Sequence, residues 1–178
     1  DETFAPAFLR NATAYGHSPM LRNDLVANNL LACAFAKGSI EIMSDGSPWR
    51  PLVHCRDIAR AFVAFMEAPV DTIRNKAVNI GDNVENFQVK DVADEVQRVM
   101  PEANITYTGE VGFDPRSYRV KFDLLNRVLP DFKLQYSLRS GTEELHQKMV
   151  EHGFGLKEFE SDQFIRLRVL QKRLVWLS

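Results

Sequence analysis

The sequence predicts an α/β fold, in which short strands alternate with amphipathic helices. Residues 76–81 are expected to form a short strand that ends at a glycine turn, whereas apolar residues recur every three or four positions along 58–65, as in a helix. The chain has 178 residues, of which 45% are hydrophobic and 26% charged, which are ordinary globular values. We therefore expect one domain over residues 1–178.

Composition argues against several classes of protein. The net charge of -2 favours neither a nucleic-acid binder nor a membrane-surface protein. No run is long and apolar enough to span a bilayer, and no signal peptide is visible. Cys33 and Cys55 have neither metal-ligand spacing nor a disulfide framework. The expected location is the cytoplasm, with no metal site and with neither nucleic acid nor membrane as a partner.

The first half of the chain predicts three strands and two helices in order. Residues 4–12 are expected to be a buried strand, which leaves through a loop at 13–16. A helix over 24–36 should end at Gly38, and the alternation over 39–43 predicts a strand. A short strand at 52–54 precedes a helix that ends near Pro69, because proline disfavours helix in the residue before it.

The second half continues the pattern. We expect strands at 76–81 and 105–108, and helices at 89–99, 121–129, 137–149 and about 156–176. In the last helix, leucines at 167, 170, 174 and 177 recur at helical spacing between basic residues. This pattern predicts an amphipathic helix docked on the domain or on a second subunit.

The stretch 46–65 carries the strongest functional signal. Arg50 stands between Trp49 and Pro51 at the start of a strand, and its planar guanidinium matches a phosphate or carboxylate. Asp57 lies in the first turn of the following helix, where the positive helix end favours an anion. The simpler interpretation is that Arg50 is a surface residue and His54 a satisfied core histidine.

The segment W-R-P-L-V-H-x-R-D-I-A-R-A-F at 49–62 resembles the second half of extended short-chain dehydrogenase/reductases. The closest group is the NAD-dependent sugar-nucleotide epimerase/dehydratase family, whose pattern reads roughly R-D-[YFW]-[IV]-H-V-x-D-[VIL]-A-x-A. The family arginine contacts the substrate diphosphate, and Arg50 matches it. Pro51 stands where the family often has Asp.

Two further segments extend this resemblance towards the N-terminus. L-R-N-A-T-A-Y-G at 9–16 is similar to the family's strand end beside the nicotinamide and the sugar. The resemblance therefore implies a substrate role for Thr13 and cofactor contacts for Ala14 and Tyr15, although polar residues there could simply cap a turn. Asn28 and Asn29 either form local hydrogen bonds or face a polar ligand, and the resemblance favours a diphosphate contact by one of the two.

Residues 109–122 resemble the family's G-x-x-x-D-x-R segment, whose arginine or aspartate contacts the nucleotide ribose or phosphate. Asp114 and Arg116 match that segment. The alternative is an exposed ion pair worth under about 1 kcal/mol.

Two family motifs are missing from the sequence. There is no G-x-G-x-x-G turn to bring a dinucleotide pyrophosphate to a helix N-terminus. There is also no Tyr-x-x-x-Lys, the acid–base pair of the family, because none of the four tyrosines has lysine four residues later. We expect the C-terminal part of a Rossmann-like enzyme with its small mixed α/β substrate-binding subdomain, the N-terminal dinucleotide-binding half being absent.

Two functions follow as hypotheses. The first is the substrate-binding portion of an NAD- or NADP-dependent epimerase/dehydratase that binds a nucleotide-sugar. We assign no catalytic residue to it and expect the chain alone to be inactive. The second is a binding or structural module that pairs with another copy through a sheet edge, giving a homodimer. A relative acting on a flavonoid or steroid is a lesser alternative, since an apolar substrate needs no phosphate clamp.

Overall fold

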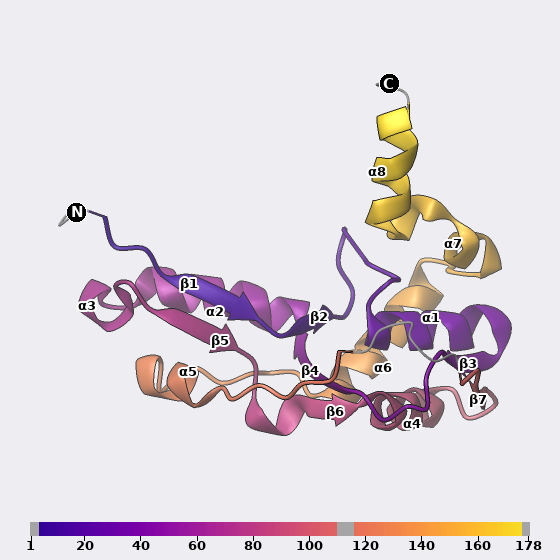
Figure 1. Cartoon of the computed structure of the whole chain (residues 1–178), viewed down its shortest axis with the longest axis horizontal. Coiled ribbons are helices and arrows are strands. Elements are labelled where there is room, and N and C mark those ends of the chain that lie inside the picture. Colours follow the sequence, from indigo (N-terminus) through magenta and orange to yellow (C-terminus); the bar gives the residue numbers. More distant parts are fainter. Residues whose placement is uncertain (1–3, 110–115, 176–178) are drawn as a thin grey trace.

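The computed structural model in Figure 1 describes residues 4–109 and 116–175. Within them the strands form three small sheets, and parallel pairs predominate, as the α/β prediction requires. β1 (Phe8–Asn11) lies parallel to β5 (Ala77–Ile80). β2 (Thr13–Tyr15) lies parallel to β4 (Trp49–His54), which pairs antiparallel with β6 (Asn86–Gln88), and β3 (Ser39–Ile42) lies parallel to β7 (Asn104–Tyr107).

The helices follow the predicted order. Gly38 ends the first of them in the left-handed conformation (φ 71°), and its N–H donates to the carbonyl of Ala34. The helices are α1 (Val26–Lys37), α2 (Cys55–Glu67), α3 (Val70–Ile73), α4 (Val89–Val99), α5 (Asp123–Val128), α6 (Leu138–Glu151), α7 (Leu156–Glu160) and α8 (Arg166–Val175), with 3₁₀ turns η1 (Asn83–Glu85) and η2 (Asp162–Phe164).

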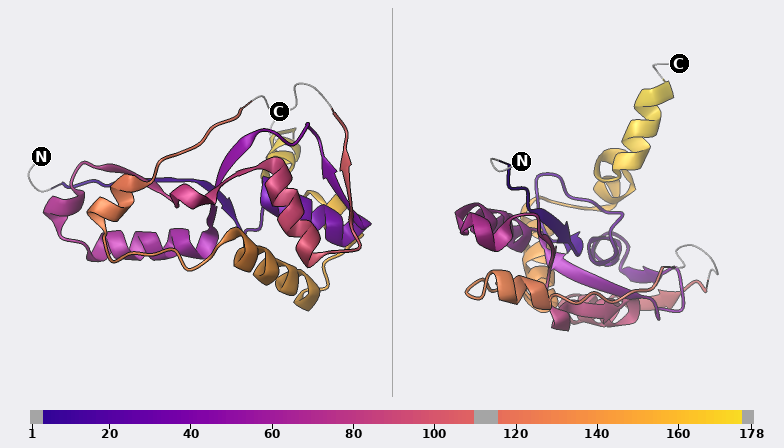
Figure 2. Two further views of the ribbon diagram at one scale, coloured as in Figure 1. Left: turned by 90° about the horizontal axis from the view of Figure 1, so that it is seen from below. Right: turned by 60° about the vertical axis from the view of Figure 1, so that its left-hand side comes forward.

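The apolar core consists of two clusters. The larger joins α1, α4 and α6 with β3, and α1 contributes five buried apolar residues to it. The smaller lies between α2, β5 and α5. Figure 2 shows these two groups of elements side by side, with β4 running between them. The C-terminal half of β4 is therefore held by packing on both sides, with Leu52 in the larger cluster and Val53 in the smaller.

Two predictions about buried faces are wrong. The predicted strand 4–12 is split, because β1 pairs with β5 while the chain crosses at Ala12 to pair β2 with β4. Phe8, expected to be buried, is 54% exposed. On α2, Ala61 and Phe65 are buried but Phe62 is 48% exposed, because the face that packs inward is narrower than the predicted one.

The predicted helix over about 156–176 is also wrong, since it is interrupted. Ser161 has extended backbone angles, and its hydroxyl donates to the carbonyl of Glu158 at 2.8 Å, a local bond that competes with the helix. Beyond it, α8 projects from the body with Leu167, Leu170 and Leu174 exposed, so it does not dock on the described domain (Figure 1). In the described parts of the chain, no helix combines the length and apolar content needed to cross a bilayer.

Candidate functional site

Arg50 and Arg116 are brought together although they are far apart in the sequence. The Nη1 of Arg50 donates to the carbonyl of Trp49 at 2.9 Å and also to the carbonyl of Arg116. The segment after Arg116 runs beside the start of β4, where the N–H of Trp49 donates to the Ser117 hydroxyl at 3.1 Å and the N–H of Tyr118 donates to the Trp49 carbonyl at 3.3 Å. Two of the predicted substrate residues thus share one surface, whereas Asp114 lies outside the described residues.

Aromatic rings alternate with guanidinium groups on this surface. The guanidinium of Arg50 lies 6.0 Å from the ring centre of Tyr118, and that of Arg119 lies 4.7 Å from Trp49. Such cation–π contacts hold a guanidinium in place over a ring. Tyr118 is 44% exposed. The surface can therefore offer charge to a phosphate and a flat face to a ring.

Two asparagines that the sequence analysis missed hold the Arg116 segment in position. Asn86 accepts from the N–H of Val120 at 2.9 Å and donates to its carbonyl at 3.1 Å, while Asn83 accepts from the N–H of Phe122 at 2.9 Å. Their side-chain amides bond to backbone groups of the Arg116 segment, as a neighbouring strand would. Because these partners are more than 30 positions away, the local sequence pattern did not reveal this role. A pocket of about 400 Å³ lies here, lined by Asn83, Asn86, Arg119, Val120, Lys121 and Asp123.

The residues predicted at the end of β2 have different environments. Tyr15 is only 2% exposed, its hydroxyl donates to the Ser137 carbonyl at 2.8 Å, and its ring packs edge-on against His54. Burial, with a smaller effect of nearby carboxylates, raises the pKa of Tyr15. The Tyr15 side chain thus has a packing role, and its expected cofactor contact stays a prediction. Thr13 and Ala14 are half-buried, and Thr13 lies in register with Leu52 of β4.

Asn28 and Asn29 also differ from each other. Asn28 is 2% exposed, accepts from the N–H of Gly16 at 2.9 Å and donates to the carbonyl of Arg22 at 3.0 Å. Both ends of its amide are therefore used in joining the preceding loop to α1. Asn29 is half-buried, and its amide donates to the Asn23 carbonyl at 2.8 Å. Local hydrogen bonding accounts for Asn28, and Asn29 stays the candidate for a ligand contact.

His54 is a satisfied core histidine, the simpler of the two interpretations. It is fully buried, its Nε2 lies 3.1 Å from Glu144, and its ring stacks on Tyr136 with 3.9 Å between ring centres. Burial lowers the pKa of His54, while Glu144 opposes that effect. Arg56 pairs with the other carboxylate oxygen of Glu144 at 2.8 Å. The cluster fixes the end of β4 and the start of α2 against α6.

Asp57 has more partners than its place in the first turn of α2 suggested. Its fully buried carboxylate accepts from the N–H groups of Gln135 (3.0 Å) and Tyr136 (2.9 Å) and from Arg60 at 2.7 Å. A buried carboxylate needs such partners to offset its lost hydration. Asp57 thus fastens the segment before α6 onto α2, which is a structural role.

A second pocket, of about 370 Å³, lies between α4 and the N-terminus of α6. Glu85 in its wall is 7% exposed and accepts from the N–H of Leu138 at 3.1 Å. Burial is the main cause that raises the pKa of Glu85 to about 7. Asp91, Asp94 and Glu95 also line this pocket, facing Arg98 and Arg139. Since these carboxylates repel a phosphate, the surface around Arg50 is the better candidate for an anionic ligand.

Residues 2–81 match the model of the NAD dependent epimerase/dehydratase family, which confirms the resemblance seen in the sequence. Solved structures of similar fold include the UDP-glucuronic acid 4-epimerase of Bacillus cereus, in complex with UDP-glucuronic acid and NAD (21% identity, TM-score 0.68, 82% of this chain covered). An epimerase of Methanothermobacter thermautotrophicus (22%, 0.73, 85%) and the UDP-glucose 4-epimerase of Thermotoga maritima (19%, 0.67, 81%) are also similar.

The match covers only part of each of these structures. The chain spans 45% of the length of each of the three. The fold is therefore that of part of an extended short-chain dehydrogenase/reductase, as predicted. The sequence has no glycine-rich dinucleotide turn, and the Tyr15 side chain is buried.

Proposed function

We propose that this chain is the substrate-binding portion of a sugar-nucleotide epimerase or dehydratase. The proposal starts from its fold, which is similar to that of the epimerases, and from the epimerase/dehydratase sequence pattern over residues 2–81. Its ligand is the nucleoside diphosphate part of a nucleotide-sugar. The relatives named above include one in complex with UDP-glucuronic acid and NAD and one with UDP-glucose, which makes a nucleotide-sugar and NAD the reference chemistry for the whole protein.

The hydrogen bond from Arg50 to the backbone of Arg116 carries this proposal. It places two guanidinium-bearing residues, 66 positions apart, on one surface beside an exposed tyrosine. Guanidinium groups bind phosphate through paired, charge-assisted hydrogen bonds, and two of them can contact both phosphates of a diphosphate. Thr13 and Asn29 are the further substrate contacts that we propose, and Asp114 and Arg116 those of the second segment.

Positioning is the contribution of these residues. Holding the diphosphate in a fixed place fixes the sugar ring attached to it, and this lowers the entropy lost in reaching the reactive geometry. When bound to the whole protein, NAD would accept and return a hydride. None of the described residues is assigned an acid–base role, since the Tyr-x-x-x-Lys pair is not in the sequence.

One observation favours the second candidate, a module that pairs with another copy. Within the described residues β1 is hydrogen-bonded to β5 alone, and Phe8 on it is 54% exposed, although parallel strands are usually buried on both faces. Pairing of β1 with a second copy would cover this edge. Under this alternative, chain association and not nucleotide binding is the property to measure.

Calorimetric titration of the chain with UDP, dTDP, CDP and GDP, and separately with NAD, tests the proposal. We expect one of the nucleoside diphosphates to bind and NAD not to bind. Arg50→Ala should weaken that binding by about tenfold or more, because a charge-assisted hydrogen bond contributes roughly 1.5–3 kcal/mol. The affinity of Arg50→Lys should fall between those of the wild type and Arg50→Ala, since lysine keeps the charge but loses the planar, two-pronged guanidinium.

The matched control is Arg127→Ala on α5, an exposed arginine outside the surface around Arg50. It should leave nucleotide affinity unchanged. An equal loss of affinity in Arg50→Ala and Arg127→Ala would mean that binding depends only on net charge. If no nucleotide binds and the chain associates in a concentration-dependent way, the self-pairing module is favoured.

A further inference from the structure

The α8 helix presents an apolar stripe that the body of the protein does not cover. Leu167, Leu170 and Leu174 are 62%, 55% and 62% exposed and recur at spacings of three and four, which places them on one face. Val169, roughly opposite them on the helix, is half-buried. The leucines therefore face away from the domain, and Figure 1 shows α8 extending from it.

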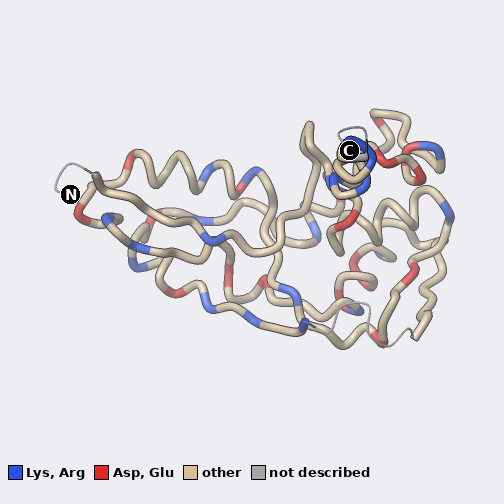
Figure 3. The backbone as a smooth tube through the Cα atoms, turned by 45° about the horizontal axis from the view of Figure 1, so that its top comes forward, with Lys and Arg blue, Asp and Glu red and all other residues tan. Residues whose placement is uncertain are grey.

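Basic residues flank this stripe on both sides. At about 100° per residue, Arg166 and Arg173 lie on one side of the leucines and Arg168 on the other, while Lys172 lies nearly opposite them. Figure 3, in which α8 is seen nearly end-on, shows Lys and Arg gathered around it. Residues 166–178 contain four basic and no acidic residues, so the rest of the chain carries a net charge of -6. The overall charge of -2 therefore conceals a strongly basic segment.

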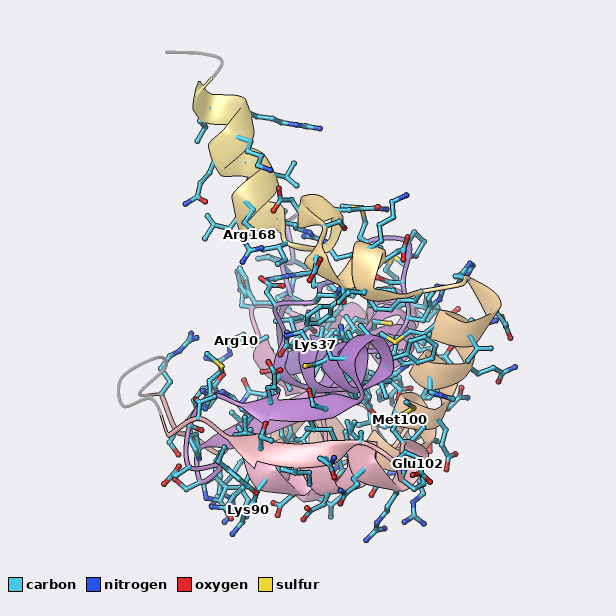
Figure 4. All side chains as sticks on the ribbon, turned by 90° about the vertical axis from the view of Figure 1, so that its right-hand side faces the viewer. Arg10, Lys37, Lys90, Met100, Glu102 and Arg168 are labelled. Carbon is cyan, nitrogen blue, oxygen red and sulfur yellow. The ribbon has the colours of Figure 1, made fainter. Side chains whose placement is uncertain are left out.

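The direction of α8 is fixed by contacts at its base. Asp162 in η2 pairs with Lys172 and lies 3.8 Å from Arg168, which is labelled in Figure 4. The N–H of Asn23 donates to the carbonyl of Phe164 at 3.0 Å, and Phe164 packs on the larger apolar cluster. The helix is thus held outward by a folded base and keeps its stripe in solvent.

We propose that α8 binds the surface of an anionic phospholipid membrane, with the leucine stripe in the headgroup–acyl boundary and with Arg166 and Arg173 among the lipid phosphates. An exposed apolar stripe bordered by basic residues on both sides has the chemistry of an interfacial helix. Nucleic acid would match the cations but would leave the leucines exposed. A second α8 packed stripe to stripe would bring like charges together. The proposal is independent of the nucleotide site.

Co-sedimentation of the full chain with vesicles tests it. We expect the chain to sediment with phosphatidylcholine vesicles that contain phosphatidylglycerol, to stay in solution with pure phosphatidylcholine vesicles, and to be released by high salt. Arg166→Gln with Arg173→Gln should lower partitioning about fivefold for each charge removed. Replacing all three leucines with serine should lower it at least tenfold.

The matched control replaces Met66 and Val70 with serine, since these residues are 77% and 49% exposed on α2 and α3. Both serine variants should fold, because the residues changed are exposed, and circular dichroism checks this. Failure to sediment with anionic vesicles would overturn the proposal. Sedimentation that survives loss of the leucines, or copies that associate through them without vesicles, would overturn it as well.

Discussion

The buried carboxyl of Glu85 predicts a pH-dependent stability of definite sign. Its pKa is raised to about 7, chiefly by burial, from an ordinary value of 4.5. Between these values the folded protein holds a proton that the unfolded chain has released, so stability is fully present below pH 4.5 and is lost as pH rises through 7. The shift corresponds to at most about 3 kcal/mol.

Glu85→Gln removes this ionisation and keeps an oxygen to accept from the N–H of Leu138. The wild type should therefore lose stability relative to the variant as pH rises. The difference in free energy of unfolding, variant minus wild type, should increase by up to about 3 kcal/mol between pH 4 and 8. Urea denaturation followed by circular dichroism at a series of pH values measures it. Contributions of His17 and His54, whose pKa values burial lowers, have the opposite sign and are common to both proteins.

The exposed Glu102, labelled in Figure 4, provides a control for the loss of one negative charge. If Glu102→Gln gives the same pH dependence as Glu85→Gln, net charge and not burial is the cause. A difference between wild type and Glu85→Gln that is flat, or that falls with rising pH, would refute the reasoning.

Three further substitutions test the packing behind the site. Asp57→Ala leaves the N–H groups of Gln135 and Tyr136 without their acceptor and should lower the free energy of unfolding by about 1–3 kcal/mol for each in urea denaturation. Gly16→Ala should also destabilise, because φ is 100° and a Cβ would lie 2.1 Å from His54; a melting temperature equal to that of the wild type would contradict this. Tyr15→Phe removes the bond to the Ser137 carbonyl and should cost about 1 kcal/mol without changing nucleotide affinity in calorimetry.

The sequence by itself determined the local elements, because their signals act over a few residues. The helix expected over 89–99 is α4, where Val92 and Val96 are buried, and Gly38 predicted the end of α1. The segment around Arg50 indicated an anion ligand through its chemistry and its family resemblance. These patterns depend on helix period and turn geometry, which are set by neighbouring residues and not by the rest of the fold.

Only the tertiary structure decided which residues meet. Arg50 contacts the backbone of Arg116 across 66 positions, and Asn28, one of two adjacent asparagines, has both ends of its amide engaged. Glu85 reaches the N-terminus of α6 across 53 positions. Whether a polar side chain binds a ligand or caps a distant backbone depends on what packs against it. The same holds for α8, whose periodicity gave an apolar face but not the direction in which that face points.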